Sequence, residues 1–320
     1  MKRQIKKIGI TLGDPSGIGP EVIVKALSGL SSREIGLLCI IGNSFVLERI
    51  PGWSRFSKKI YLFDLDNINK NRFCFGRVSS EFGKASLEYL NFSLALIKAK
   101  EFSALVTCPV NKYSINLIYR NFLGQTEYLA KFDHARLVRM MLLSKELKFS
   151  LVSTHLPLKT VCQKLKKEDI VETIVLTALE LKRLFFRSHP KIGVCGLNPH
   201  LGEGGLVGKE EDQIIKPAII QAQKKIKVAQ ISGPWALEKI VFALEKREID
   251  TGICLYHDQA MVPLKLLKPK RGINLTLGLS FVRTSPLHGT AFDIAGKNNA
   301  DPTSLIDAIR LALELSRLRK

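Results

Sequence analysis

Three histidines each follow a short apolar run and lie in a polar, turn-rich segment. His155 lies in Ser-Thr-His-Leu-Pro-Leu, His200 in Asn-Pro-His-Leu-Gly-Glu-Gly-Gly, and His257 in Tyr-His-Asp-Gln. Each apolar run is typical of a buried strand, and an open α/β sheet gathers its strand ends into one crevice. Three imidazoles can hold one divalent metal and leave positions open for a substrate. The pattern therefore predicts a metalloenzyme in which these three histidines are ligands.

The segment of His257 carries two further ionisable groups. Asp258 follows the histidine directly, and Lys265 comes shortly afterwards. A carboxylate and an amine beside a ligand-type imidazole are suited to proton transfer, so both are candidate catalytic residues. A His–Asp pair by itself is more often a hydrogen-bonded loop feature, but the two other histidine segments favour the catalytic interpretation.

Two other segments carry polar groups that could bind an anion. Arg283 is followed by Thr and Ser, and its planar guanidinium suits a phosphate or a carboxylate. His288, further along, suits a fourth metal ligand and a structural role equally. Near the N-terminus, the stretch from Gly13 to Glu21 reads Gly-Asp-Pro-Ser-Gly-Ile-Gly-Pro-Glu. It either presents backbone N–H groups to an anion or is only a turn before a helix, and it lacks the third glycine of a Rossmann fingerprint.

Short apolar strands alternate with amphipathic helices along the chain, which favours an α/β fold with a mostly parallel sheet covered on both faces. A body of two lobes with the site between them is expected, since ligand sites favour domain junctions. We expect strands at 8–12, 36–42, 104–107, 149–153, 192–196, 228–231 and 251–256, and helices at 84–100, 127–147, 168–185, 209–225, 235–246 and 303–319, with a further segment at 273–277 before the last helix.

The composition of the 320-residue chain excludes several classes of protein. Hydrophobic residues make up 46%, enough for a large core, yet no apolar run is long enough to span a membrane, and no signal peptide is recognisable. A cytoplasmic enzyme with structural, unpaired cysteines is expected. The net charge of +20 is spread along the whole chain without a nucleic-acid-binding motif, so we interpret it as a Lys-rich solvated surface that can steer an anionic substrate.

Seven segments, in order, resemble the 4-hydroxythreonine-4-phosphate dehydrogenase family of pyridoxal phosphate biosynthesis, and the resemblance covers nearly the whole chain. They are Gly-Asp-Pro-Ser-Gly-Ile-Gly-Pro-Glu, Thr-Cys-Pro-Val-Asn-Lys, Gly-Gln-Thr-Glu-Tyr-Leu-Ala, Thr-His-Leu-Pro-Leu, Gly-Leu-Asn-Pro-His-Leu-Gly-Glu-Gly-Gly, Tyr-His-Asp-Gln, and Arg-Thr-Ser-Pro-Leu-His-Gly-Thr-Ala-Phe-Asp-Ile-Ala-Gly.

The resemblance implies a fold like the isocitrate and isopropylmalate dehydrogenases, which is not a Rossmann domain. On this basis we expect a first α/β lobe at 1–115 plus 290–320, a second lobe at 116–289 carrying the metal histidines, and an active site in the cleft. A homodimer that completes the metal site at its interface is implied, with no nucleic-acid or membrane partner.

The resemblance also implies an activity and a set of site residues. NAD or NADP would accept hydride from C3 as the 3-hydroxyl of 4-phosphooxy-L-threonine is oxidised to a ketone, and the resulting 3-keto acid would decarboxylate to 3-amino-2-oxopropyl phosphate. One divalent ion (Zn, Co, Mg or Mn) would assist, and Lys265 would accept a proton or pair with substrate anions. The family's metal ligands fall on His155, His200 and His257, and its substrate-binding positions on Gln125, Thr126, Lys265, Asn274 and Arg283.

The chain departs from the family pattern at several positions. Gln125 replaces a usual histidine and cannot exchange a proton near neutral pH. Leu287 replaces an aspartate, Glu238 an aspartate, and Ala260 a glycine. These changes leave two alternatives open: a related dehydrogenase of a phosphorylated sugar acid, such as 4-phospho-erythronate or 4-phospho-threonate, and a non-catalytic or nucleic-acid-binding descendant.

Overall fold

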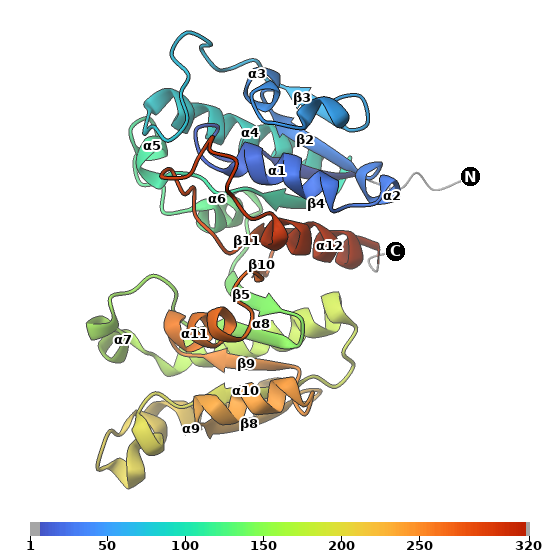
Figure 1. Ribbon diagram of the computed structural model, residues 1–320. Coiled ribbons are helices and arrows are strands. Elements are labelled where there is room, and N and C mark those ends of the chain that lie inside the picture. The colour runs from blue at the N-terminus through green and yellow to red at the C-terminus, as the bar shows by residue number, and fades with distance from the viewer. Residues whose placement is uncertain (1–6, 318–320) are drawn as a thin grey trace. The chain divides into compact units, whose positions relative to one another are not determined.

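The computed structural model describes residues 7–317 and divides into two compact units (Figure 1). Unit 1 holds the residues up to Arg136 together with those from Leu279 onward, and unit 2 is Leu137–Gly278. These boundaries differ from the expected ones at 115/116 and 289/290, so that residues 116–136 and 279–289 lie in unit 1. Gln125, Thr126 and Arg283 therefore belong to unit 1, whereas the three histidines belong to unit 2.

Unit 1 is built on a five-stranded parallel sheet in the order β3-β2-β1-β4-β11. Neighbouring residues of β1 are buried although their side chains point to opposite faces, so both faces of the sheet are covered. The last strand enters the sheet only after unit 2 has been completed, unlike a simple Rossmann domain. The strands are β1 (Lys7–Thr11), β2 (Leu38–Gly42), β3 (Tyr61–Asp64), β4 (Phe102–Thr107) and β11 (Val282–Pro286).

The helices of unit 1 pack against this sheet and against each other. Helix α4 contacts β1, β2 and β4, while α1 packs on α12, which contacts β4 and β11. The helices are α1 (Gly19–Ser28), α2 (Ser32–Ile35), α3 (Ser44–Glu48), η1 (Trp53–Arg55), α4 (Ser80–Lys98), α5 (Lys112–Asn116), α6 (Gln125–Phe132) and α12 (Thr303–Arg317).

Unit 2 contains six strands in the order β10-β5-β6-β9-β7-β8. Strands β6, β9, β7 and β8 run parallel, and β5 is antiparallel to both of its neighbours. The prediction of a mostly parallel α/β fold is confirmed. The strands are β5 (Arg139–Ser144), β6 (Leu147–Leu151), β7 (Lys191–Cys195), β8 (Gln230–Trp235), β9 (Thr251–Cys254) and β10 (Ile273–Leu277).

Helices surround the sheet of unit 2, with α8 packed on α9, and with α10 and α11 in contact with β6 and β9. None of the helices in residues 7–317 is long and apolar enough to cross a membrane. The helices are α7 (Leu158–Lys164), α8 (Lys167–Phe185), η2 (Pro199–Gly205), η3 (Glu211–Ile215), α9 (Lys216–Lys225), α10 (Leu237–Glu245) and α11 (His257–Leu267).

The predicted helix at 127–147 is wrong beyond residue 132. Helix α6 ends at Phe132, and His134 has a φ of 50°, which closes the helix. The following apolar run pairs with β10 on one side and β6 on the other, and Lys145, with a φ of 50°, turns the chain between β5 and β6. This run forms a strand and not a helix because its backbone N–H and C=O groups pair with strands on both sides, and the periodicity of the sequence does not show such pairing.

Candidate active site

The three predicted metal histidines lie after the carboxyl ends of adjacent parallel strands in unit 2. His155 follows β6, His257 begins α11 directly after β9, and His200 lies in η2 after β7. Since β9 pairs with both β6 and β7, the three segments leave the sheet at the same edge. Parallel pairing thus brings together residues that are far apart in the sequence.

Two of the three imidazoles are neighbours. The ring centroids of His155 and His257 lie 6.0 Å apart. Metal–nitrogen bonds are about 2.0–2.1 Å long, so two imidazoles on one tetrahedral ion have centroids about 5 Å apart. The rings of His155 and His257 are therefore near the spacing of two metal ligands, about 1 Å wider than a shared ion requires. Within residues 7–317, no group of three His, Cys, Asp or Glu side chains is close enough to hold an ion, so His200 does not complete the pair in a single chain.

A carboxylate orients one of these rings. Asp258 Oδ1 lies 2.7 Å from His257 Nδ1, and the Asp258 side chain is 67% exposed. In the tautomer that carries its proton on Nδ1, the imidazole donates to this carboxylate and keeps the Nε2 lone pair for a metal. The geometry therefore gives Asp258, predicted as catalytic, a positioning contact with the ring.

The loop that carries His200 is held by a buried glutamate that the sequence analysis missed. Glu211 is 1% exposed, and its Oε1 accepts hydrogen bonds from the backbone N–H of Leu197 and Asn198 at 2.7 and 2.8 Å. Its Oε2 accepts from the Asn198 amide at 2.8 Å. The only sequence signal was an acidic residue a short way beyond a turn, which is too common to single out.

Gln259 joins the histidine segments to each other. Its Oε1 accepts from the backbone N–H of Leu255 at 2.8 Å, and its Nε2 donates to the carbonyl of Gly196 at 2.8 Å. Ser153 Oγ donates to the carbonyl of Leu255 at 2.7 Å. Side-chain hydrogen bonds of Ser153 and Gln259 therefore connect the segments that follow β6, β9 and β7 and that carry the three histidines.

The other candidates of unit 2 lie on α11 and β10. Lys265 is exposed in the last turn of α11. Asn274, on β10, is half-buried, and its Oδ1 is buried without a hydrogen-bond partner among the described residues. A buried acceptor without a donor costs about 1–3 kcal/mol, so this oxygen is suited to accept from a ligand or a water molecule.

Arg283 forms the centre of a polar group in unit 1. Its side chain is buried on β11, and Nε and Nη2 donate to Thr107 Oγ1 at 3.1 and 2.7 Å. Its Nη1 lies 3.5 Å from Thr126 Oγ1. Burial lowers the Arg283 pKa to about 10, and the Glu127 carboxylate opposes this shift, so the guanidinium stays charged at neutral pH. A buried cation with oriented N–H donors is suited to a phosphate or a carboxylate.

Gln125 lies at the start of α6, next to Thr126. Its Nε2 donates to the carbonyl of Cys108 at 3.0 Å, while its buried Oε1 has no hydrogen-bond partner in the described part of the chain. Because a carbonyl can only accept, the amide must turn its NH₂ toward Cys108 and its oxygen away. Gln125 therefore offers an acceptor to a ligand that carries an O–H or N–H group.

Four backbone N–H groups of the N-terminal glycine turn donate to acceptors within the protein. The N–H groups of Asp14, Ser16, Gly17 and Ile18 donate to Pro109 O, Asp14 Oδ1, Asp14 O and Thr290 O, at 2.9–3.0 Å. Gly13 has a φ of 74°, and a Cβ there would lie 2.3 Å from the carbonyl of Pro109, so the turn requires glycine. Of the two interpretations, the structure favours a turn that leads into α1.

Comparisons with known proteins agree with the resemblance of the motifs. A family model described as pyridoxal phosphate biosynthetic protein PdxA matches residues 31–312. The chain is 40% identical to a 4-hydroxythreonine-4-phosphate dehydrogenase of Sulfurihydrogenibium sp., covering 98% of this chain and 99% of the relative. It is 36% identical to a D-threonate 4-phosphate dehydrogenase of Cupriavidus necator over all of both chains.

A solved structure is similar over nearly the same length. The crystal structure of 4-hydroxythreonine-4-phosphate dehydrogenase from Klebsiella pneumoniae superimposes with a TM-score of 0.85 at 29% identity. The match covers 97% of this chain and 99% of the other.

Proposed function

The chain belongs to the PdxA family of pyridoxal phosphate biosynthetic proteins, and on that basis we propose that it is an NAD-dependent dehydrogenase of 4-phosphooxy-L-threonine. The secondary alcohol would be oxidised to a ketone: the hydrogen on its carbon would leave as hydride to NAD, and the hydroxyl proton would be lost to a base. The resulting 3-keto acid would then release carbon dioxide to give 3-amino-2-oxopropyl phosphate. The adjacent rings of His155 and His257 are the observation that carries the metal-dependent part of this proposal.

The residues of unit 2 would act at the reacting end of the substrate. A bound divalent metal would supply positive charge beside the hydroxyl, and NAD (or NADP) would supply the hydride acceptor. His155 and His257 would hold the metal together with His200, and Asp258 would orient His257. Lys265 Nζ would accept the hydroxyl proton or pair with a substrate anion.

The residues of unit 1 would bind an anionic end of the substrate. Arg283 is fixed by Thr107, so its charge and its donors are oriented before a phosphate or carboxylate arrives. Thr126 contributes a hydroxyl next to the guanidinium. Gln125 would accept a hydrogen bond from a substrate ammonium or hydroxyl through its Oε1, which has no donor in the described residues.

We further propose that the protein is a homodimer that completes the metal site. Large apolar side chains are exposed in the segments that follow the three histidines: Leu158 is 64% exposed, Leu206 87% and Leu266 77%. Contact with a second copy would bury these side chains. Light scattering and sedimentation velocity should give the mass of a dimer, and Leu266→Glu should shift the protein toward monomer with loss of bound metal.

Steady-state rates test the choice of substrate. Reduction of NAD should be more efficient, as kcat/KM, with 4-phosphooxy-L-threonine than with D-threonate 4-phosphate or erythronate 4-phosphate. The reverse order would establish the alternative, a dehydrogenase of a phosphorylated sugar acid, which the Cupriavidus necator relative keeps open. Gln125→Met should lower kcat/KM for the preferred substrate more than Gln125→His does, because histidine is the usual family residue at this position.

A non-catalytic or nucleic-acid-binding role makes the opposite prediction. It requires no NAD reduction with any of these phosphorylated hydroxy acids, together with nucleic-acid binding that resists added salt in a gel-shift assay. The net charge of +20 motivates this control experiment.

A further inference from the structure

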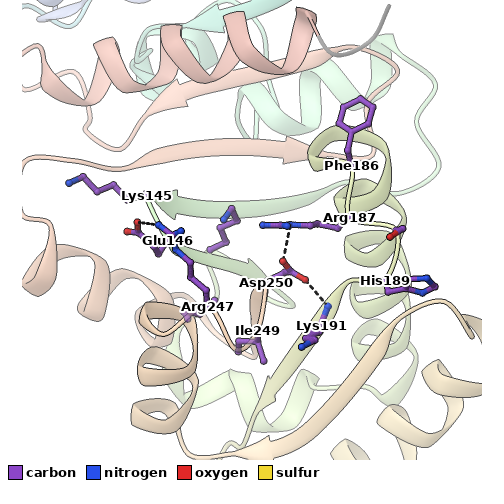
Figure 2. Close-up of a pocket in the computed structure, with 12 residues that line it drawn as sticks. Lys145, Glu146, Phe186, Arg187, His189, Lys191, Arg247, Ile249 and Asp250 are labelled. Atoms are coloured by element: carbon purple, nitrogen blue, oxygen red, sulfur yellow. Dashed lines mark hydrogen bonds and ion pairs between the residues drawn. The ribbon is translucent and has the colours of Figure 1, made fainter.

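Unit 2 contains a pocket of about 660 Å³, whose lining residues Figure 2 shows, at the amino ends of strands β6, β7 and β9. It is lined by the turn that precedes β6, by the segment that joins α8 to β7, and by the residues that precede β9. His155, His200 and His257 follow the other ends of these same three strands. The pocket and the three histidines therefore lie at opposite ends of β6, β7 and β9, with the length of the strands between them.

The lining carries an excess of positive charge. Five Lys and Arg side chains face two carboxylates. Arg187 Nε pairs with Asp250 Oδ1 at 3.0 Å, and Arg247 Nη2 with Glu146 Oε1 at 3.1 Å, as Figure 2 shows. The cations left over are three lysines, which make no ion pair in the part of the chain that the structure describes: Lys145, Lys148 and Lys191.

Lys148 is the lysine of this pocket whose burial and charged neighbours favour an anionic ligand. Its side chain is half-buried, and its Nζ lies 5.7 Å from the centre of the Phe185 ring. Burial lowers the Lys148 pKa, and nearby Arg187 lowers it further, although Asp250 and Glu146 oppose the shift. An ammonium in this setting is incompletely compensated, and an anion bound beside it would supply the missing negative charge.

We propose that this pocket binds a small polyanion of the oligophosphate class. The ammonium groups of these three lysines make no ion pair among the described residues, and they match the charge of a ligand with about three negative charges; phosphate oxygens accept several hydrogen bonds from ammonium groups. The volume lies within the ~300–1,000 Å³ of small-molecule sites. A concave pocket between strand ends also favours a compact ligand over a nucleic-acid backbone, which binds along extended basic surfaces.

Calorimetric titration of the full-length protein with inorganic tripolyphosphate, at fixed ionic strength, tests the proposal. We expect saturable binding that Lys148→Met weakens about tenfold, the effect of losing one charge-assisted hydrogen bond. Lys224→Met is the matched control, because Lys224 is an exposed lysine of α9 outside the pocket and its loss changes the net charge equally. It should change the affinity less than about twofold. Lys145→Gln, at an exposed position, tests the same pocket if Lys148→Met does not fold.

Four results would overturn the proposal. The first is the absence of saturable binding, and the second is equal weakening by Lys148→Met and Lys224→Met, which would mean binding to general positive charge. The third is binding that is lost in Thr107→Val and kept in Lys148→Met, which would place the anion at Arg283. The fourth is tighter binding of single-stranded DNA than of tripolyphosphate with the same dependence on Lys148, which would make the pocket part of a nucleic-acid surface.

Discussion

Arg283 and Thr107 are joined by two hydrogen bonds, because Nε and Nη2 of the guanidinium both donate to the one threonine Oγ1. The two residues lie 176 positions apart in the sequence and meet because β11 pairs with β4. A hydroxyl that accepts from two donors of a planar group fixes the orientation of that group. Thr107 is therefore a positioning residue for Arg283, the centre of the proposed anion-binding group in unit 1.

Thr107→Val keeps the shape of the side chain and removes the acceptor. We expect KM for the phosphorylated substrate to rise about tenfold with a smaller change in kcat, since the lost contact orients binding and not the reacting atoms. Steady-state kinetics would measure both constants. Thr107→Ser keeps the hydroxyl and should stay near the wild-type values. A large fall in kcat with KM unchanged would contradict the role of Thr107 in binding.

His155→Gln and His257→Gln should each lower the metal bound per chain. Elemental analysis of protein purified without added metal, followed by chelation and re-addition, measures this content. Asp258→Asn should weaken metal affinity about tenfold, because outer carboxylates orient ligand imidazoles. The control is His134→Gln in unit 1, which should retain the wild-type metal content. Equal metal content in all four proteins would rule out the proposed site.

Lys265→Met separates metal binding from proton transfer. If Lys265 accepts the substrate proton, kcat should fall by about 100-fold or more, while metal content stays unchanged. If Lys265 only pairs with a substrate anion, KM should rise instead. Lys268→Met is the matched control: Lys268 lies three positions after Lys265, at the end of α11, and is not a predicted site residue. This variant should leave kcat and KM near the wild-type values. Unchanged turnover in Lys265→Met would remove this residue from the mechanism.

Glu211→Gln tests the support of the His200 loop. A glutamine cannot accept at both ends of its amide, so the hydrogen bonds to Leu197 and Asn198 cannot all be kept. We expect the free energy of unfolding to fall by about 2 kcal/mol, with weaker metal binding as a second effect. Glu210→Gln is the control, because Glu210 Oε2 accepts from the same Asn198 side chain at 2.7 Å but Glu210 is only half-buried. Chemical denaturation would measure both variants, and equal losses would contradict the special role of Glu211.

Asp14 should make stability depend on pH in an unusual direction. Burial raises the Asp14 pKa to about 6, against hydrogen bonds from the backbone of Ser16 and Asn111. The folded protein therefore holds this proton at pH values at which the unfolded chain has released it. The contribution of Asp14 to stability is present at low pH and is lost, by up to about 3 kcal/mol, as pH rises from about 4 to about 6.

Asp14→Asn removes this titration. Denaturation curves across the same range of pH should show a smaller loss of stability with rising pH in Asp14→Asn than in the wild type. Asp212→Asn, at an exposed position, should keep the wild-type dependence. Identical pH profiles for Asp14→Asn and the wild type would mean that Asp14 ionises normally in the folded protein.

The local pattern of apolar residues was sufficient to predict many of the helices and strands. It failed where pairing with other strands determines whether a segment is a strand. The strand at 192–196 and the helix at 168–185 were predicted close to β7 and α8, since apolar periodicity and length suffice there. The run 139–144 was joined to a helix because its apolar residues extend the preceding amphipathic pattern. Strand β11 was not predicted, because its sequence contains polar residues and lacks the apolar run that is typical of a buried strand, although all of its residues are buried.

The sequence by itself determined which chemical groups are available: the three histidine segments, the arginine beside hydroxyls, and the motifs of the family. The tertiary structure alone decided that His155 adjoins His257, that Thr107 holds Arg283, and that Glu211 supports the loop of His200. It also collected Lys145, Lys148 and Lys191 in the pocket at the amino ends of β6, β7 and β9. Local periodicity reflects burial within one element, whereas these contacts depend on the order and register of strands that backbone hydrogen bonds join across the chain.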